Sequence, residues 1–168
     1  MIKEQIDIYN NKVKKKYYSW VTIGSSFLLS EFVASYLLPQ ILNYHKIFQY
    51  RSKLYLRYIY NFRKWLKNEF YLTNNYKYTY NFHAFVIILG KNDREKFLNY
   101  LKKYNISAVI SYMPLHKSKA GKIYKKNNDK LNNTNNLAKK IIRLPLHNYL
   151  SFKDIDYICD KIKKYFKN

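Results

Sequence analysis

Apolar side chains recur every three or four residues between positions 29 and 66. This spacing places them along one face of an α-helix. Ser26 or Ser30 can cap the start of that helix, and Pro39 should bend or split it. The pattern predicts a long amphipathic helix, which would reach roughly 55 Å if it were straight. Its apolar positions are Leu29, Phe32, Val33, Tyr36, Leu37, Ile41, Tyr44, Ile47, Phe48, Leu54, Tyr55, Tyr58, Phe62 and Trp65.

Beyond this helix the pattern becomes typical of strands. Residues 67–81 lose the helical period and gain Asn, Thr and Tyr, which indicates a loop or a weak strand. The run HAFVIIL, residues 83–89, is continuous, apolar and rich in β-branched side chains. Such a run predicts a strand that is covered on both faces. A second strand is predicted for ISAVISYM, residues 106–113, and Pro114 limits its length.

Two further helices carry recognisable start signals. Asn92 or Asp93 can cap a helix that ends at Asn105. Ser151 and Asp154 have the spacing of a capping box at the start of the last helix. The apolar stripes that support these two helices are Phe97, Leu98, Leu101 and Tyr104, and Ile155, Ile158, Cys159, Ile162 and Phe166.

The segment between the second strand and the last helix is polar. Residues 117–136 are rich in Lys and Asn and show neither a helical nor a strand period, which predicts a surface loop. Thr134 can cap a short helix through Ile142, after which Pro145 turns the chain toward the last helix. Together the elements predict an α/β fold, or α+β, built as a layer of strands and helices.

The chain carries 32 Lys and Arg against 10 Asp and Glu, a formal net charge of +22. Such a charge is typical of proteins that bind nucleic acid or anionic membranes. Tyr17, Tyr18 and Trp20 lie beside the lysines at 14–16 and can stack on bases, although the stretch also suits a solvated strand edge. The composition has a second explanation, which is drift in an A/T-rich genome. The codons of Lys, Asn, Ile, Tyr and Phe are the richest in A and T, so such drift enriches these residues without any selected partner. The hypothesis of a small basic module that binds nucleic acid therefore stays open, and such binding would be non-specific and through charge.

The number of cysteines and the pattern of the first 20 residues indicate the cellular compartment of the protein. Cys159 is the single cysteine, which excludes an internal disulfide and favours a reducing compartment. The first 20 residues have no apolar core of the kind that signal peptides carry. The apolar stretch 23–42 is interrupted by serines, Glu31 and Pro39, so a buried helix is favoured over a membrane span. These features predict a cytoplasmic protein.

Short catalytic motifs are not recognisable in the sequence. The three glycines stand apart, which excludes a Gly-rich phosphate loop, and the four histidines are too dispersed to predict a metal site. His116 is the best functional candidate among them, because it follows a strand end and a proline. The turn Gly24-Ser25-Ser26 can hold an anion on its backbone N–H groups, or it can serve as an ordinary N-cap.

Four blocks of the sequence occur in an order and spacing that resemble a known family. The blocks are YSWVTIGSSFLLSEFVASYLLPQI, HAFVIIL, NISAVISYMPLHKSKAG and RLPLHNYLSFKDID. From about residue 13 to residue 166, the chain resembles the C-terminal half of sugar-nucleotide aminotransferases of the DegT family. Within that family it is most similar to the branch that makes dTDP-4-amino-4,6-dideoxygalactose for enterobacterial common antigen, a cell-surface polysaccharide.

The resemblance implies the small-domain portion of a fold type I enzyme that depends on pyridoxal 5'-phosphate (PLP) and works as a homodimer. The implied reaction is amino transfer from glutamate to a dTDP-4-keto-6-deoxy sugar. By the same matching, Gly24, Ser25 and Ser26 would approach the cofactor phosphate of the neighbouring subunit. The positions that would contact the sugar nucleotide are Phe27, Tyr112 and His116.

The resemblance covers only the second half of the family's fold. In the family, the large domain comes first and holds the Schiff-base lysine, the acid that faces the pyridine nitrogen and most phosphate contacts. No catalytic residue is therefore assigned here, and we expect the chain alone not to transaminate. It would need the large domain or a split-gene partner. A remnant of a decaying gene and a fragment kept for another binding role stay open as alternatives.

The resemblance also divides the chain into three parts. Residues 1–22 would be the remnant of the large-domain edge, and residues 23–72 a long helical segment at the interdomain or dimer interface. Residues 73–168 would form the C-terminal α/β small domain. Elements that normally face a large domain leave apolar surface uncovered, so we expect the chain alone to be poorly soluble.

Overall fold

The chain forms two units in the computed structural model. The sheet unit comprises Ser30–Ile110 and Lys140–Asn168, and the loop unit comprises Met1–Leu29 and Ser111–Lys139. The domain boundaries predicted at residues 22 and 72 follow the family's fold instead, and they stay a prediction. The structure describes residues 24, 29–63, 70–72, 81–90, 93–110, 112–124 and 130–167.

A four-stranded antiparallel sheet lies at the centre of the sheet unit. Its strands are β1 (Phe70–Leu72), β2 (Phe85–Leu89), β3 (Val109–Ile110) and β4 (Ile141–Leu144), and they pair in the order β1-β2-β4-β3. The register of the central pair sets Phe85 opposite Leu144 and Ile88 opposite Ile141. The two longest strands therefore form the middle of the sheet, and the two shortest form its edges.

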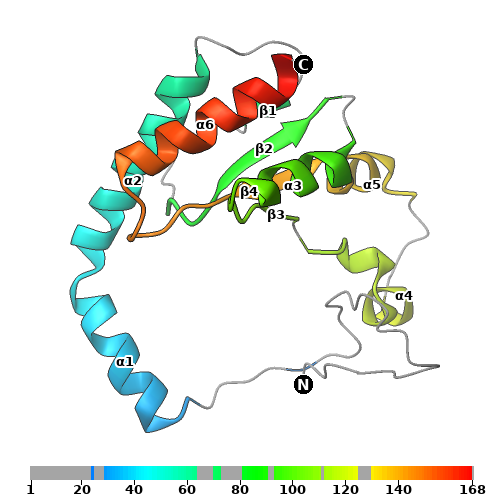
Figure 1. The fold of residues 1–168 in the computed structure, drawn as a ribbon. Coiled ribbons are helices and arrows are strands. Elements are labelled where there is room, and N and C mark those ends of the chain that lie inside the picture. The colour runs from blue at the N-terminus through cyan, green and yellow to red at the C-terminus, as the bar shows by residue number, and fades with distance from the viewer. Residues whose placement is uncertain are drawn as a thin grey trace, which may run out of the picture. The chain divides into compact units, whose positions relative to one another are not determined.

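Three helices cover one face of this sheet, and Figure 1 shows them on the same side of the strands. They are α2 (Tyr44–Arg63), α3 (Arg94–Lys103) and α6 (Phe152–Lys167). α2 and α6 run side by side in the same direction, because Tyr50 bonds to Leu150 and Arg57 bonds to Asp156 further along both helices. The predicted mixed α/β fold is confirmed.

Burial alternates along β2. Phe85, Ile87 and Leu89 are fully buried, whereas Val86 and Ile88 are only half-buried. The strand predicted at this position is confirmed, but complete burial on both faces is wrong, because all three covering helices lie on one side. An antiparallel sheet tolerates one less covered face, which a parallel sheet rarely does.

Aromatic rings fill the core between the sheet and the helices. Phe85 of β2 stacks on Tyr58 of α2 with ring centroids 4.4 Å apart, and it packs against Tyr55 at 4.9 Å. Phe97 of α3 meets Phe166 of α6 at 5.4 Å. Rings at these separations gain attraction beyond the area that they bury. The aromatic cluster thus joins all three helices to the sheet.

Two predicted helix caps are confirmed. The Asp93 side chain accepts hydrogen bonds from the backbone N–H groups of Glu95 and Lys96 at the start of α3. At the start of α6, the Ser151 N–H donates to the Asp154 carboxylate and the Asp154 N–H donates to the Ser151 hydroxyl. This reciprocal pair is a capping box. The backbone hydrogen bond to Asp154 holds the pKa of that carboxyl below its ordinary value.

The predicted long helix is split into two. α1 (Glu31–Leu42) starts at Ser30, whose hydroxyl accepts a bond from the Val33 N–H, and α2 follows after Asn43. The backbone N–H and the side-chain amide of Asn43 both donate to the carbonyl of Pro39. Pro39 therefore lies inside α1, and the helix ends one turn after it, as the prediction of a bent or split helix allowed.

The prediction of one amphipathic stripe is wrong for α1. None of its residues is buried, and its apolar side chains lie on every side of the helix. Phe32 is 86% exposed and Leu42 is 74% exposed. Only α2 has the predicted buried stripe, formed by Leu54, Tyr55, Tyr58 and Phe62.

Short helices occupy most of the segment that was predicted to be an irregular loop. In the loop unit these are the 3-10 turn η1 (Leu115–Lys117), α4 (Lys119–Tyr124) and α5 (Asn132–Ala138). The predicted short helix therefore ends before Ile142. Residues 141–144 form β4, because pairing with β2 overrides their local tendency to turn. The strand predicted at 106–113 is shortened to β3, and the weak strand predicted within 67–81 is β1.

Candidate functional site

The predicted phosphate turn is described at one position only. Gly24 is exposed, while Ser25, Ser26 and Phe27 lie outside the described residues. Their assignment to the cofactor phosphate and to the sugar nucleotide stays a prediction. The other two predicted site residues, Tyr112 and His116, lie in the loop unit and are described.

The His116 loop runs from Tyr112 to Tyr124 and contains η1 and α4. Its backbone is fixed by Ser118, which is 1% exposed. The Ser118 hydroxyl donates to the Leu115 carbonyl at 2.7 Å and accepts from the Gly121 N–H at 2.9 Å. A buried hydroxyl with both a donor and an acceptor bond ties one end of η1 to the start of α4. His116 therefore lies on a turn that is held at both ends.

Gly121 allows η1 and α4 to approach each other closely. A Cβ atom added at Gly121 would lie 1.8 Å from the carbonyl oxygen of Leu115. No side chain fits at that distance, so the turn around His116 requires glycine at this position. In the sequence Gly121 is an isolated glycine, although Ser118, three positions before it, is a typical N-cap residue.

The structure brings His116 together with Asn135 of α5. The Nε2 atom of His116 lies 2.9 Å from the Oδ1 atom of Asn135, and both side chains are half-buried. The Asn135 side-chain amide in turn donates to the Lys130 carbonyl at 3.1 Å. Tyr112 is 59% exposed. The loop thus presents one exposed phenol and one imidazole held by a neighbouring helix.

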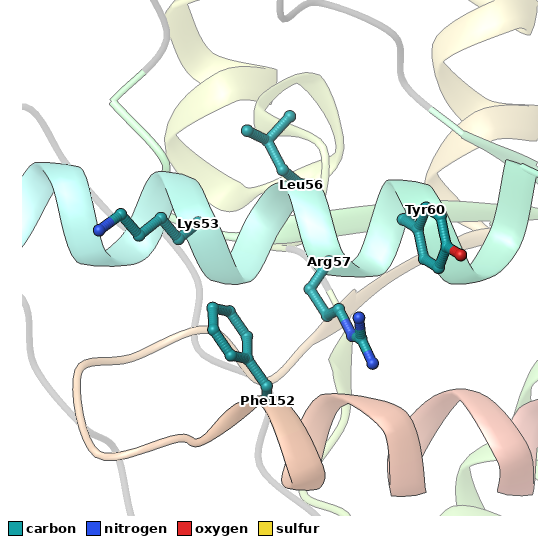
Figure 2. Close-up of a pocket in the computed structure, with 5 residues that line it drawn as sticks. All are labelled: Lys53, Leu56, Arg57, Tyr60 and Phe152. Atoms are coloured by element: carbon teal, nitrogen blue, oxygen red, sulfur yellow. The ribbon is translucent and has the colours of Figure 1, made fainter.

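A first groove, the α2–α6 groove, lies in the sheet unit and has a volume of about 330 Å³. Figure 2 shows Phe152 rising from the start of α6 toward α2, and Arg57 reaching from α2 toward α6. Arg57 donates two hydrogen bonds to Asp156, at 2.8 and 2.6 Å, and Asn61 donates a third at 2.7 Å. The bonds from Arg57 lower the pKa of the Asp156 carboxyl. The residues that line this groove are Lys53, Leu56, Arg57, Tyr60 and Phe152.

A second groove, the α1 groove, lies where α1 and α2 meet the loop before α6, and its volume is about 840 Å³. Arg51 lines this groove and donates to the Leu146 carbonyl at 2.9 Å and to the His83 carbonyl at 3.3 Å. Five of the other nine lining residues are aromatic or apolar, and four are polar. The groove is lined by Phe32, Ser35, Tyr36, Pro39, Gln40, Ile47, Arg51, His147, Asn148 and Tyr149.

Neither groove fits PLP by itself. The cofactor requires a lysine and a partner for its pyridine nitrogen. In the α2–α6 groove, Lys53 is exposed, and the carboxylate beside Arg57 already bonds to Arg57 and Asn61. The residues that line the α1 groove include neither a lysine nor a carboxylate. The described residues therefore do not form a complete cofactor site.

The described residues form neither a cluster of metal ligands nor a helix that could span a membrane. Within those ranges, no three His, Cys, Asp or Glu side chains gather closely enough to hold a metal ion. No helix in the described part of the chain is both long enough and apolar enough to cross a bilayer.

The sequence of this chain is similar to that of a known protein family. Residues 2–163 match the model of the DegT/DnrJ/EryC1/StrS aminotransferase family. The chain belongs to this family. The resemblance carried by the four sequence blocks is thereby confirmed at the level of the family, and the DegT-family match gives no support to a nucleic-acid-binding module. No curated protein sequence matches the chain significantly.

Solved structures show the same fold. PseC of Helicobacter pylori, an aminotransferase involved in the biosynthesis of pseudoaminic acid, aligns with 99% of this DegT-family chain at a TM-score of 0.72 and 21% identity. Spr1654 of Streptococcus pneumoniae, described as a sugar aminotransferase and solved in its PLP form, aligns with 83% at 0.71 and 22% identity. A DegT DnrJ EryC1 StrS aminotransferase of Brucella abortus aligns with 79% at 0.67 and 23% identity.

The alignments cover a minor part of each solved structure. They span 43% of the PseC chain, 36% of the Spr1654 chain and 34% of the Brucella chain. The DegT-family chain thus spans less than half of the length of these aminotransferases.

Proposed function

We propose that this chain is the C-terminal part of a PLP-dependent sugar-nucleotide aminotransferase, and that it acts together with the family's large domain. The match of residues 2–163 to the aminotransferase family carries the proposal. The proposed reaction is amino transfer from glutamate to a dTDP-4-keto-6-deoxy sugar, in the synthesis of a cell-surface polysaccharide such as enterobacterial common antigen. The proposed assembly is a homodimer.

The proposal divides the work between two parts of the enzyme. The large domain supplies the lysine that holds PLP, because the described residues do not form a complete cofactor site. This chain supplies the His116 loop for the sugar nucleotide, with Tyr112 and His116 as contacts and Phe27 beside them. Gly24, Ser25 and Ser26 are proposed to face the cofactor phosphate of the neighbouring subunit. By itself the chain is proposed not to transaminate.

Borohydride trapping tests whether this chain carries the PLP lysine. The purified chain is incubated with PLP, reduced with borohydride and mapped by peptide mass spectrometry. We expect scattered, substoichiometric labelling of surface lysines, equal to that of the heat-denatured chain as control. A single stoichiometric adduct on one lysine would contradict the proposed division of work.

Reconstitution tests the proposed reaction. The chain is combined with a polypeptide that carries the large domain, and transfer of ¹⁵N from glutamate to dTDP-4-keto-6-deoxyglucose is followed. We expect transfer only from the combination, and a decrease of about tenfold for His116→Gln, which removes one ligand hydrogen bond. His45→Gln, at an exposed position of α2, is the matched control and should have no effect. A combination that binds PLP but transfers no nitrogen would overturn the proposed reaction.

A further inference from the structure

The direction of the hydrogen bond between His116 and Asn135 follows from the neighbours of Asn135. The Asn135 Nδ2 group donates to the Lys130 carbonyl at 3.1 Å, so the Oδ1 atom is the one that faces His116. An amide oxygen can only accept a hydrogen bond. The proton must therefore lie on Nε2 of His116, which donates to Asn135 across 2.9 Å.

This bond leaves the other ring nitrogen available. Among the described residues, none bonds to Nδ1 of His116. A neutral imidazole with its proton on Nε2 presents Nδ1 as a hydrogen-bond acceptor. The acceptor therefore has a defined direction, because Asn135 fixes the rotation of the ring.

We propose that Asn135 is a positioning residue for His116 in the binding of the nucleotide sugar. It holds the imidazole so that Nδ1 accepts a hydrogen bond from a hydroxyl or N–H donor of the ligand. The inference rests on the proposed function, which assigns His116 to the sugar nucleotide. Asn135 itself does not touch the ligand in this arrangement.

The surrounding loop supports this role by fixing the backbone. Ser118 and Gly121 hold the turn that carries His116, and Asn135 holds its side chain. Two separate segments supply these constraints. η1 and α4 fix the backbone of the turn, and α5 holds the side chain of His116. A side chain ordered before binding loses less conformational freedom when the ligand binds.

Two substitutions of Asn135 separate the hydrogen bond from the shape of the side chain. Asn135→Asp keeps an oxygen acceptor for Nε2, whereas Asn135→Leu keeps a similar volume but offers no acceptor. Asn133→Ala, at an exposed position of the same helix, is the matched control. The measurement is the NMR signal of the His116 Nε2 proton in the ¹⁵N-histidine-labelled full chain, assigned by its loss in His116→Gln. We expect an exchange-protected signal in the original chain, in Asn135→Asp and in Asn133→Ala, and its loss in Asn135→Leu.

A binding titration connects the positioning to the ligand, with dTDP-glucose as the probe. We expect Asn135→Leu to weaken binding by about three- to tenfold, and Asn135→Asp to restore it to within about twofold of the original chain. An unchanged Nε2 proton signal in Asn135→Leu would overturn the positioning role, whatever the binding shows. If the signal behaves as expected but dTDP-glucose does not bind to the chain alone or with the large domain, the proposed function fails.

Discussion

At the scale of single residues, a carboxylate with three donors joins α2 to α6. Asp156 accepts two bonds from Arg57 and one from Asn61, and its side chain is 41% exposed. A bidentate pair of this geometry contributes more than an ordinary surface ion pair, although solvent still screens it. The pKa of Asp156 lies below its ordinary value of 3.8 as a result. This pair is the main electrostatic link between the two helices.

The lowered pKa of Asp156 predicts a specific dependence of stability on pH. A carboxyl group with a lowered pKa in the folded state stabilises the fold above its ordinary pKa, and this contribution disappears as the pH falls through the folded value. Asp156→Asn should therefore lower the Tm at neutral pH by about 2 to 4 °C and reduce the loss of stability below pH 4. Thermal unfolding between pH 7 and pH 2 measures both effects.

Asp160→Asn is the control for this measurement. Asp160 pairs with Lys164 one turn away on the exposed face of α6, a kind of pair that contributes little. Its Tm should stay within about 1 °C of the original at neutral pH. Equal pH profiles for Asp156→Asn and the original chain would show that the link between α2 and α6 does not depend on the Asp156 charge.

Residues with local partners were predictable from the sequence, and residues with distant partners were not. The caps at Asp93 and Ser151 depend on groups within three positions, so their spacing alone identified them. The partner of His116 lies 19 residues away in a segment rich in Asn and Lys. Nothing in that segment distinguishes Asn135 from its neighbours until the chain is folded.

At the scale of elements, periodic patterns predicted the elements that are buried. β2, α2, α3 and α6 were each recognisable, because burial imposes their period. β4 was missed, because its four residues are followed closely by Pro145, and its identity as a strand comes from pairing with β2. In the loop unit, α5 was predicted with a later start and a later end, whereas η1 and α4 were missed for a related reason. They are short, largely exposed and therefore show no apolar period.

The close contact between η1 and α4 predicts that Gly121→Ala disrupts the His116 loop. The added methyl group would meet the Leu115 carbonyl, so either the turn or α4 must move. We expect a loss of stability of about 1 to 3 kcal/mol in this segment, as is usual for overpacking. Hydrogen exchange at the Gly121 N–H, which now bonds to Ser118, measures the change.

Lys122→Ala is the matched control on α4. Lys122 is exposed, and alanine is a good helix former, so its substitution should leave exchange in the loop unchanged. Unaltered exchange protection in Gly121→Ala would show that η1 and α4 are further apart in solution than in the structure.

At the scale of the whole molecule, the DegT-family chain carries an apolar helix, α1, that the described residues of its own unit do not bury. α1 carries no buried residue, and Glu31 is its only charged residue. A helix that is apolar on all sides is normally enclosed by other protein. The alignment with less than half of each solved aminotransferase is consistent with a covering part that lies outside the aligned region.

The exposed side chains of α1 predict self-association of the chain when it is studied alone. Substituting both Phe32 and Leu42 by Ser should weaken association by about tenfold or more, because each large apolar side chain contributes on the order of 2 kcal/mol when buried. The Tm of the sheet unit should not change, because neither side chain is buried. Sedimentation at several concentrations measures the association.

Leu56→Ser tests whether any exposed apolar side chain has this effect. Leu56 is 53% exposed on α2, away from α1, and its substitution should leave association unchanged. A chain that sediments as a single monomeric species at all concentrations would contradict the prediction. The family was recognisable from the sequence because its blocks are long, whereas the exposure of α1 on every side needed the structure.

The position of Cys159 makes the chain suitable for one kinetic measurement. It is the single thiol, it is 1% exposed within α6, and burial raises its pKa to about 12. An alkylating reagent can react with it only after the packing around α6 has opened, because the buried neutral thiol is unreactive. The rate of alkylation under native conditions therefore reports the opening of the core around this helix, with no engineered label and no second cysteine to contribute to the signal.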